Sequence, residues 1–142
     1  MAQETATALP PDLAREFAAA ATNGCVGTRL LSEDPRCRVW TIVLEPGERI
    51  GFHTHVLDYF WTAATAGRAR SHYGDGRVAE VEYRAGDIRH LAFGPGESMT
   101  HDLANIGDTT LVFTTVEFLD GANPPLALPA AIRAEADAAP TR

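Results

Sequence analysis

The chain has 142 residues, a length typical of one domain that can bury its own core. Its 12 basic and 19 acidic residues give a net charge of −7, which repels phosphate backbones and anionic lipids, so we expect neither nucleic acid nor a membrane as a partner. The N-terminus lacks the pattern of a signal peptide and no stretch approaches the ~20 apolar residues of a membrane span. We therefore expect a cytoplasmic protein, with Cys25 and Cys37 as free thiols.

The N-terminal part, residues 1–25, is expected to be a flexible lead-in followed by a short helix. Residues 1–11 are polar and end in Pro10-Pro11. The helix is predicted over residues 11–22, where proline and aspartate precede an alanine-rich run.

Residues 26–119 read as a series of short strands separated by turns. "GDGR" (74–77) is a strong hairpin signal, because Asp-Gly tolerates the positive φ of a tight turn. This pattern of short strands and turns predicts an all-β sandwich or barrel. The runs rich in β-branched and aromatic residues are "RVWTIVL", "IGFHTH", "YFWTAATAG", "RARSHY", "RVAEVEY", "IRHLAF" and "TTLVFTTVEFL".

Residues 120–142 are predicted to be an irregular tail. Pro124-Pro125 and Pro129 prevent a continuing strand. The alanine-rich end leaves open either a short helix or a disordered terminus.

His53 and His55 are the first candidates for chemistry. Side chains alternate along a strand, so both imidazoles lie on one face and can reach a single cation. The alternative is that one histidine is hydrogen-bonded in the core and the other is solvated.

The residues around this pair resemble the first motif of the cupin superfamily. Five residues separate Gly47 from the His53-x-His55 pair, and Gly67 closes the stretch. A second stretch, "GDIRHLAFGPGESMTHDLANIGD", resembles the second motif, with His101 followed by Asn105.

The resemblance covers roughly residues 38–119 and implies a jelly-roll β-barrel. It also implies that His53, His55 and His101 converge on one divalent metal ion inside the barrel. Imidazole ligands suit Fe(II), which we favour, and also Mn, Ni, Cu or Zn. Small cupins usually pair, so the resemblance implies a homodimer.

The first motif departs from the family pattern at the position of its glutamate ligand, which is Phe60 here. The site implied by the resemblance is therefore three histidines with an apolar ring in place of the carboxylate. Asp58 either replaces that acid or caps a turn, and we favour the turn. Tyr59 either brings a phenol near the metal or packs in the core.

The second motif departs through extra residues within "PGESMT", which predict a longer loop at the barrel mouth. An ungapped count makes Glu97 the third ligand, but we prefer His101, because its spacing to Asn105 is intact.

Three further polar residues are weaker pocket candidates. Arg70 and His72 share one face of a predicted strand, and His90 lies among small apolar neighbours on another. His90 is a candidate fourth ligand or general base, although we favour a structural role for both His72 and His90.

These residues support three hypotheses of function, each with a small-molecule ligand. The first is an Fe(II) dioxygenase that acts on a chelating oxygen- or thiol-containing substrate. The second is a redox-neutral isomerase, cyclase or lyase that uses His90, Tyr59, His72 or Glu117 as a base. The third is a non-catalytic barrel that binds a small ligand.

Overall fold

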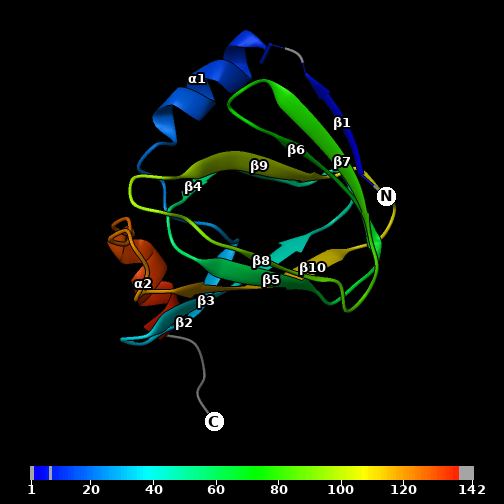
Figure 1. Ribbon diagram of the computed structural model, residues 1–142. Helices are drawn as coiled ribbons and strands as arrows, with labels where there is room; N and C mark the ends of the chain where they lie inside the picture. The colour runs from blue at the N-terminus through cyan, green and yellow to red at the C-terminus, as the bar shows by residue number, and fades with distance from the viewer. Residues whose placement is uncertain (1, 7, 138–142) are drawn as a thin grey trace.

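Two five-stranded antiparallel sheets face each other (Figure 1), in a computed structural model that describes residues 2–6 and 8–137. Sheet A has the order β1-β7-β6-β9-β4, and sheet B has the order β2-β3-β10-β5-β8. The strands of sheet A are β1 (Ala2–Ala6), β4 (Arg49–His55), β6 (Gly67–His72), β7 (Arg77–Tyr83) and β9 (Met99–Asn105). The strands of sheet B are β2 (Arg29–Glu33), β3 (Cys37–Leu44), β5 (Tyr59–Ala63), β8 (Ile88–Leu91) and β10 (Leu111–Phe118). The predicted all-β jelly-roll class is confirmed.

The core lies between the two sheets and follows from strand alternation. In β3 and β10, every second side chain is buried, and the register places Ile42 opposite Phe113 and Leu44 opposite Leu111. Trp61 packs its ring edge-on against Phe113, with ring centroids 5.7 Å apart. Burial of these apolar side chains supplies most of the driving force for folding.

The predicted hairpin at residues 74–77 is present between β6 and β7. The Tyr73 amide donates to the Arg77 carbonyl at 2.9 Å, and Gly76 has a φ of 86°. A non-glycine side chain is disfavoured at that φ, which explains the glycine.

The N-terminal prediction is partly wrong. Instead of a flexible lead-in, Ala2–Ala6 form β1, which pairs with β7 and satisfies backbone groups that an edge strand leaves exposed. The predicted helix is α1 (Pro11–Ala19), which ends before residue 22. It lies over the outer face of sheet A (Figure 1). Residues 1 and 7 lie outside the described residues.

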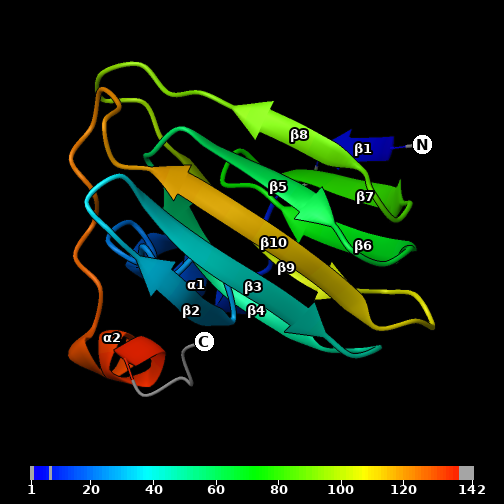
Figure 2. The same ribbon diagram turned by 90° about the horizontal axis from the view of Figure 1, so that it is seen from below.

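The C-terminal tail is irregular as far as Pro129, and the short helix that the sequence left open follows it. Residues 130–137 form α2 (Ala130–Asp137), whose Ile132 packs against the buried cluster of Val26, Leu30 and Trp40. Residues 138–142 lie outside the described residues. The helix lies beside β2, while the rest of the outer face of sheet B carries no helix (Figure 2).

Two smaller findings concern the cysteines and the helices. Cys25 and Cys37 form no disulfide, as predicted. Within the described part of the chain, neither helix is long and apolar enough to cross a membrane.

Candidate metal centre

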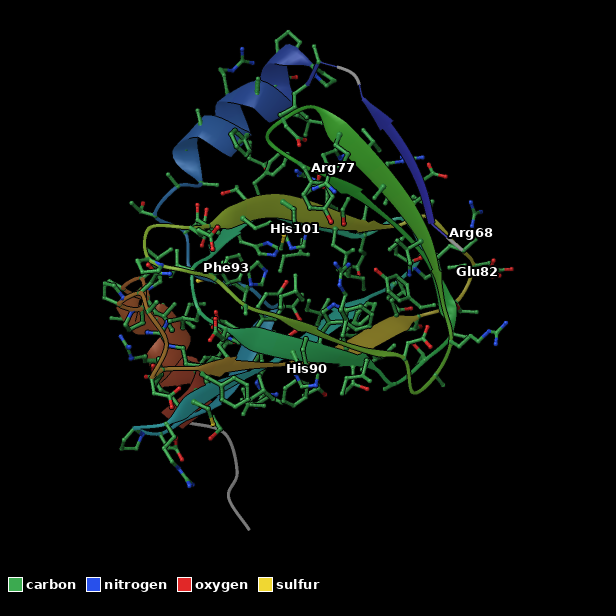
Figure 3. All side chains as sticks on the ribbon, viewed as in Figure 1. Arg68, Arg77, Glu82, His90, Phe93 and His101 are labelled. Carbon is green, nitrogen blue, oxygen red and sulfur yellow. The ribbon has the colours of Figure 1, made fainter. Side chains whose placement is uncertain are left out.

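Three histidines from two neighbouring strands of sheet A meet in the space between the sheets. His53 and His55 come from β4, and His101 comes from β9 directly opposite His53. One ring nitrogen from each lies within 4.8 Å of the others. Figure 3 shows His101 directed into the space between the sheets. The two distant stretches of sequence therefore supply one cluster of ligand atoms.

A β-bulge in β4 makes this convergence possible. The register between β4 and β9 pairs Ile50 with Leu103, then shifts, and pairs His53 with His101. Paired residues of an antiparallel sheet share a face, so an unshifted register would pair His53 with Thr100 and turn His53 away from His101. The extra residue restores His53 to the inner face.

The spacing of one pair of ring nitrogens fits a common metal ion. The Nε2 atoms of His55 and His101 are 3.2 Å apart. Two nitrogens that each lie about 2.0–2.1 Å from one ion, at angles of roughly 90–110°, are about 2.9–3.4 Å apart. The same distance also fits a hydrogen bond between the two imidazoles when no metal is bound.

The protonation states also fit metal binding. Burial lowers the pKa of His53 to about 4, and burial with the neighbouring imidazoles lowers the pKa of His55 and His101 well below the usual value. Near pH 7 all three rings are neutral and offer lone pairs. The Nδ1 of His53 lies 2.8 Å from the Gly51 carbonyl, a contact in which the ring nitrogen donates, which leaves Nε2 free to ligate.

Part of the cluster is not satisfied by the protein. The Nδ1 atoms of His55 and His101 are buried and have no hydrogen-bond partner among the described residues. A buried polar atom without a partner costs about 1–3 kcal/mol, so such atoms are rare outside functional sites. These Nδ1 atoms lie on the far side of each ring from the Nε2 atoms that face one another.

The histidines line a cavity of about 240 Å³ whose wall carries positive but no negative side chains. Arg77 and Arg89 line it, and neither aspartate nor glutamate is among its described lining residues. The Arg77 guanidinium lies 4.0 Å from the centre of the Tyr73 ring. The other aromatic residues in the wall are Tyr59, Trp61, Tyr83 and Phe113.

Tyr59 lines the cavity, as a role near the metal requires. Its ring stacks on His55 with centroids 4.1 Å apart and planes 13° apart. Burial raises the pKa of its phenol, which therefore stays protonated. A catalytic role for Tyr59 stays a prediction.

Phe60 does not line the cavity, so its prediction as a pocket residue is wrong. It lies on the outer face of sheet B, where its ring centre is 5.3 Å from that of His90 and 6.1 Å from that of Phe118. Alternation directs Tyr59 and Trp61 inward and Phe60 outward. No side chain at the position of the family's glutamate faces the histidines.

The two carboxylates considered as ligands cap loops instead. Asp58 accepts a hydrogen bond from the Phe93 amide at 2.8 Å, the turn role that the sequence favoured. Glu97 is exposed and accepts from the Gly94 amide at 2.5 Å, so His101 and not Glu97 joins the cluster.

The remaining candidates also face away from the cavity. Arg70 pairs with Glu80 at 3.0 Å, and His72 contacts Asp102 at 3.1 Å. His90 is exposed on the outer side of β8 (Figure 3), so it is neither a fourth ligand nor a base in this cavity. The sequence did not say which face of these strands is inside, and in the structure Arg70, His72 and His90 all lie outside the cavity.

Sequence reasoning missed the two cavity arginines. Arg89 is adjacent to His90 and shares the inner face of β8 with Leu91, opposite Trp61. Arg89 and His90 are adjacent polar residues, so the sequence left open which of the two faces inward, and pairing with β5 decides it. Arg77 begins β7 directly after the predicted turn, a place with no distinctive signal.

Known proteins resemble the chain in both sequence and structure. No protein-family model matches it. Oxalate decarboxylase OxdC of Bacillus subtilis (strain 168) is 32% identical over 77 residues, which are 53% of this chain and only 19% of that protein. A cupin domain from Bordetella pertussis Tohama I superposes with a TM-score of 0.55 at 25% identity, over 63% of this chain and 88% of that one. A Klebsiella pneumoniae protein with a double-stranded β-helix domain gives 0.52 at 28% identity, over 70% and 82% of the two chains.

The fold and the site together define a cupin barrel with a three-histidine cluster that can hold a metal ion. The chain has the fold of the cupin domain with which it superposes.

Proposed function

We propose that the protein is an Fe(II)-dependent dioxygenase that acts on a small, chelating, anionic substrate. The observation that supports it is the convergence of three imidazoles in a cavity whose described lining offers no carboxylate and no further histidine. Three neutral ligands leave the ion its full charge and about three open positions on an octahedral metal.

A bound Fe(II) would supply Lewis acidity toward a chelating substrate and redox chemistry toward dioxygen. The residues His53, His55 and His101 would hold the ion. The aromatic wall around them, which includes Tyr59 and Trp61, limits the access of water.

The charge and size of the cavity support a small anion as the substrate. Arg77 and Arg89 bring two positive charges to a cavity without acidic lining, although the whole chain carries a net charge of −7. The volume of about 240 Å³ is below the roughly 300–1,000 Å³ of pockets for drug-sized ligands. Either guanidinium can hold a carboxylate while a second donor of the substrate reaches the metal.

The lack of a free base among the described cavity residues favours the dioxygenase over an enzyme that moves a proton on its substrate. His72 and His90 face outward, and Glu117 does not line the cavity. Tyr59 stays protonated because burial raises the pKa of its phenol. An isomerase or cyclase that must move a proton on the substrate finds no free base among the described lining residues.

A second candidate is a metal-dependent lyase that removes carbon dioxide from a small carboxylic acid. The similarity to OxdC, whose name describes an oxalate decarboxylase, supports it over part of the chain. The two arginines suit a carboxylate substrate in this reaction as well.

The test begins with metal content. Protein purified without chelators is compared by elemental analysis with a His53→Ala, His101→Ala double variant, and equal metal in both would refute the centre. The protein is then loaded anaerobically with Fe(II) and assayed for oxygen uptake with small hydroxy, oxo and thiol carboxylic acids. Oxygen uptake that the double variant lacks supports the dioxygenase. Carbon dioxide release under argon with Mn(II) and no oxygen uptake with Fe(II) would favour the lyase.

An Arg89→Gln variant tests the substrate class. We expect KM for an anionic substrate to rise about tenfold or more, because a hydrogen bond to a charged group contributes roughly 1.5–3 kcal/mol. Arg70→Gln is the matched control, since Arg70 pairs with Glu80 outside the cavity. An unchanged KM in Arg89→Gln would contradict the assignment of Arg89 to the substrate.

A further inference from the structure

Three backbone groups of the bulge that turns His53 toward His101 have side-chain partners. The Gly51 carbonyl is 2.8 Å from Nδ1 of His53. The Phe52 amide donates to Oε2 of Glu16 at 2.7 Å, and the Phe52 carbonyl accepts from Asn23 at 2.9 Å. A bulge removes such groups from the ladder, so they need partners elsewhere. Here the partners are the ligand His53 itself and residues of α1 and the segment after it.

Glu16 is the charged member of this set, and it connects both strands that carry the histidines. Its two oxygens accept from the two terminal nitrogens of Arg49 at 2.9 and 2.7 Å. The Nε of Arg49 donates to Asp102 at 2.8 Å, and Asp102 is fully buried beside His101. One network on the outer face of sheet A therefore reaches the residues next to His53 and next to His101.

The packing around Glu16 leaves room for its carboxylate at one glycine. A Cβ atom on Gly51 would lie 3.0 Å from Oε2 of Glu16, closer than ordinary contacts. The neighbouring Phe17 of α1 meets Phe52 edge-on, with ring centroids 5.5 Å apart. Figure 1 shows α1 lying along this side of sheet A. Glycine at position 51 lets α1 bring its acid against the bulge.

We infer that Glu16 of α1 is a positioning residue for the candidate metal centre, and that it acts through the Phe52 amide to hold the bulge and thereby the imidazole of His53. The inference rests on the proposed metal site. Glu16 touches neither the cavity nor the histidines, so its effect on metal binding passes through the backbone of Gly51 and Phe52.

A substitution that keeps the size of Glu16 tests this role. The carboxylate of Glu16 accepts hydrogen bonds from the Phe52 amide and from two nitrogens of Arg49. Glu16→Gln keeps only one oxygen and removes the negative charge, so these hydrogen bonds are lost or weakened. Gly51→Ala presses on the same contact from the other side, because the new methyl group would lie 3.0 Å from Oε2 of Glu16 and the carboxylate must shift to make room. Asp12→Asn is the matched control, since Asp12 lies on the same helix and pairs with the exposed Arg15.

The experiment measures Co(II) affinity and the visible spectrum of the Co(II)-loaded protein for wild type and the three variants. We expect Glu16→Gln and Gly51→Ala to weaken Co(II) binding about tenfold and to shift the visible bands, as loss of a supporting hydrogen bond does at other metal sites. Asp12→Asn is expected to match wild type. Wild-type affinity and spectrum in a folded Glu16→Gln or Gly51→Ala variant would overturn the inference.

A readout without metal separates this inference from the proposed function. In metal-free wild type, nitrogen NMR of His53 is expected to show the hydrogen on Nδ1 and slow exchange with solvent, because that hydrogen is bonded to Gly51. Exchange is expected to accelerate in Glu16→Gln. Failure of wild type to bind Co(II) would refute the metal centre, whereas unchanged His53 exchange in Glu16→Gln would refute the positioning role.

Discussion

Glu117 gives a prediction whose size follows from the structure. It is 2% exposed, faces the interior on β10 and accepts a hydrogen bond from the Trp40 indole at 2.8 Å. Burial raises the pKa of its carboxyl from 4.5 to about 7, against the opposing effects of the Trp40 hydrogen bond and the Arg38 charge. At about 1.4 kcal/mol for each tenfold change, ionising this carboxyl in the folded protein costs about 3 kcal/mol more than in the unfolded chain.

The sign of the pH dependence follows from proton binding. Between pH 4.5 and about 7 the folded protein holds a proton on Glu117 that the unfolded chain has released. The contribution of Glu117 to the free energy of unfolding therefore falls as the pH rises through this window and levels off above it. Glu117→Gln removes the ionisation and keeps an oxygen for Trp40. We expect the variant to gain about 3 kcal/mol relative to wild type between pH 4 and pH 8.

Urea unfolding of both proteins at pH 4 and pH 8 measures this change. The comparison uses the difference between variant and wild type at each pH, so that other titrating groups cancel. Glu82→Gln, at an exposed position (Figure 3), is the control and is expected to show no such change. A difference between Glu117→Gln and wild type that is the same at both pH values would refute the reasoning.

Three further outcomes are expected. Asp58→Ala should lower the free energy of unfolding by about 1–2 kcal/mol, because the Phe93 amide loses its acceptor. The metal content should stay unchanged, and a loss of metal would show that Asp58 contributes to the centre. If the protein pairs through the outer face of sheet B, where Ile88 is 56% exposed, Phe60→Lys should lower the mass measured by sedimentation velocity, and an unchanged dimer would place the interface elsewhere. Chelator should lower the melting temperature of the metal-loaded protein. If the free metal concentration is 1,000 times its Kd, the lost stabilisation is about 4 kcal/mol. The His53→Ala, His101→Ala variant should show no change.

Two of the three candidate ligands could be predicted from short-range geometry, and the third from the resemblance to the second cupin motif. His53 and His55 share a face in any extended strand, and the spacing from His101 to Asn105 identified the third histidine despite the longer loop. The hairpin at residues 74–77 likewise follows from the glycine that its φ requires.

The wall of the cavity could not be predicted in the same way. In "YFW" (59–61) three successive aromatic residues give no alternation between polar and apolar, so the sequence does not say that Tyr59 and Trp61 face inward and Phe60 outward. In "IRHL" (88–91) the polar residues Arg89 and His90 are adjacent, and only pairing with β5 decides that Arg89 lines the cavity.

The sequence by itself determined the strand-rich class, the turns and the shared face of His53 and His55, because each depends on dihedral preferences or on alternation within a few residues. The resemblance of the second motif added His101. Tertiary structure alone decided which face of β5, β6 and β8 is inside, and that a bulge beside Gly51 aligns β4 with β9. It also decided that Glu16 of α1 accepts a hydrogen bond from the Phe52 amide of that bulge, 36 residues along the chain. The physical reason is that strand parity and the partners of a displaced backbone amide are set by pairing between distant segments, which a local pattern does not encode.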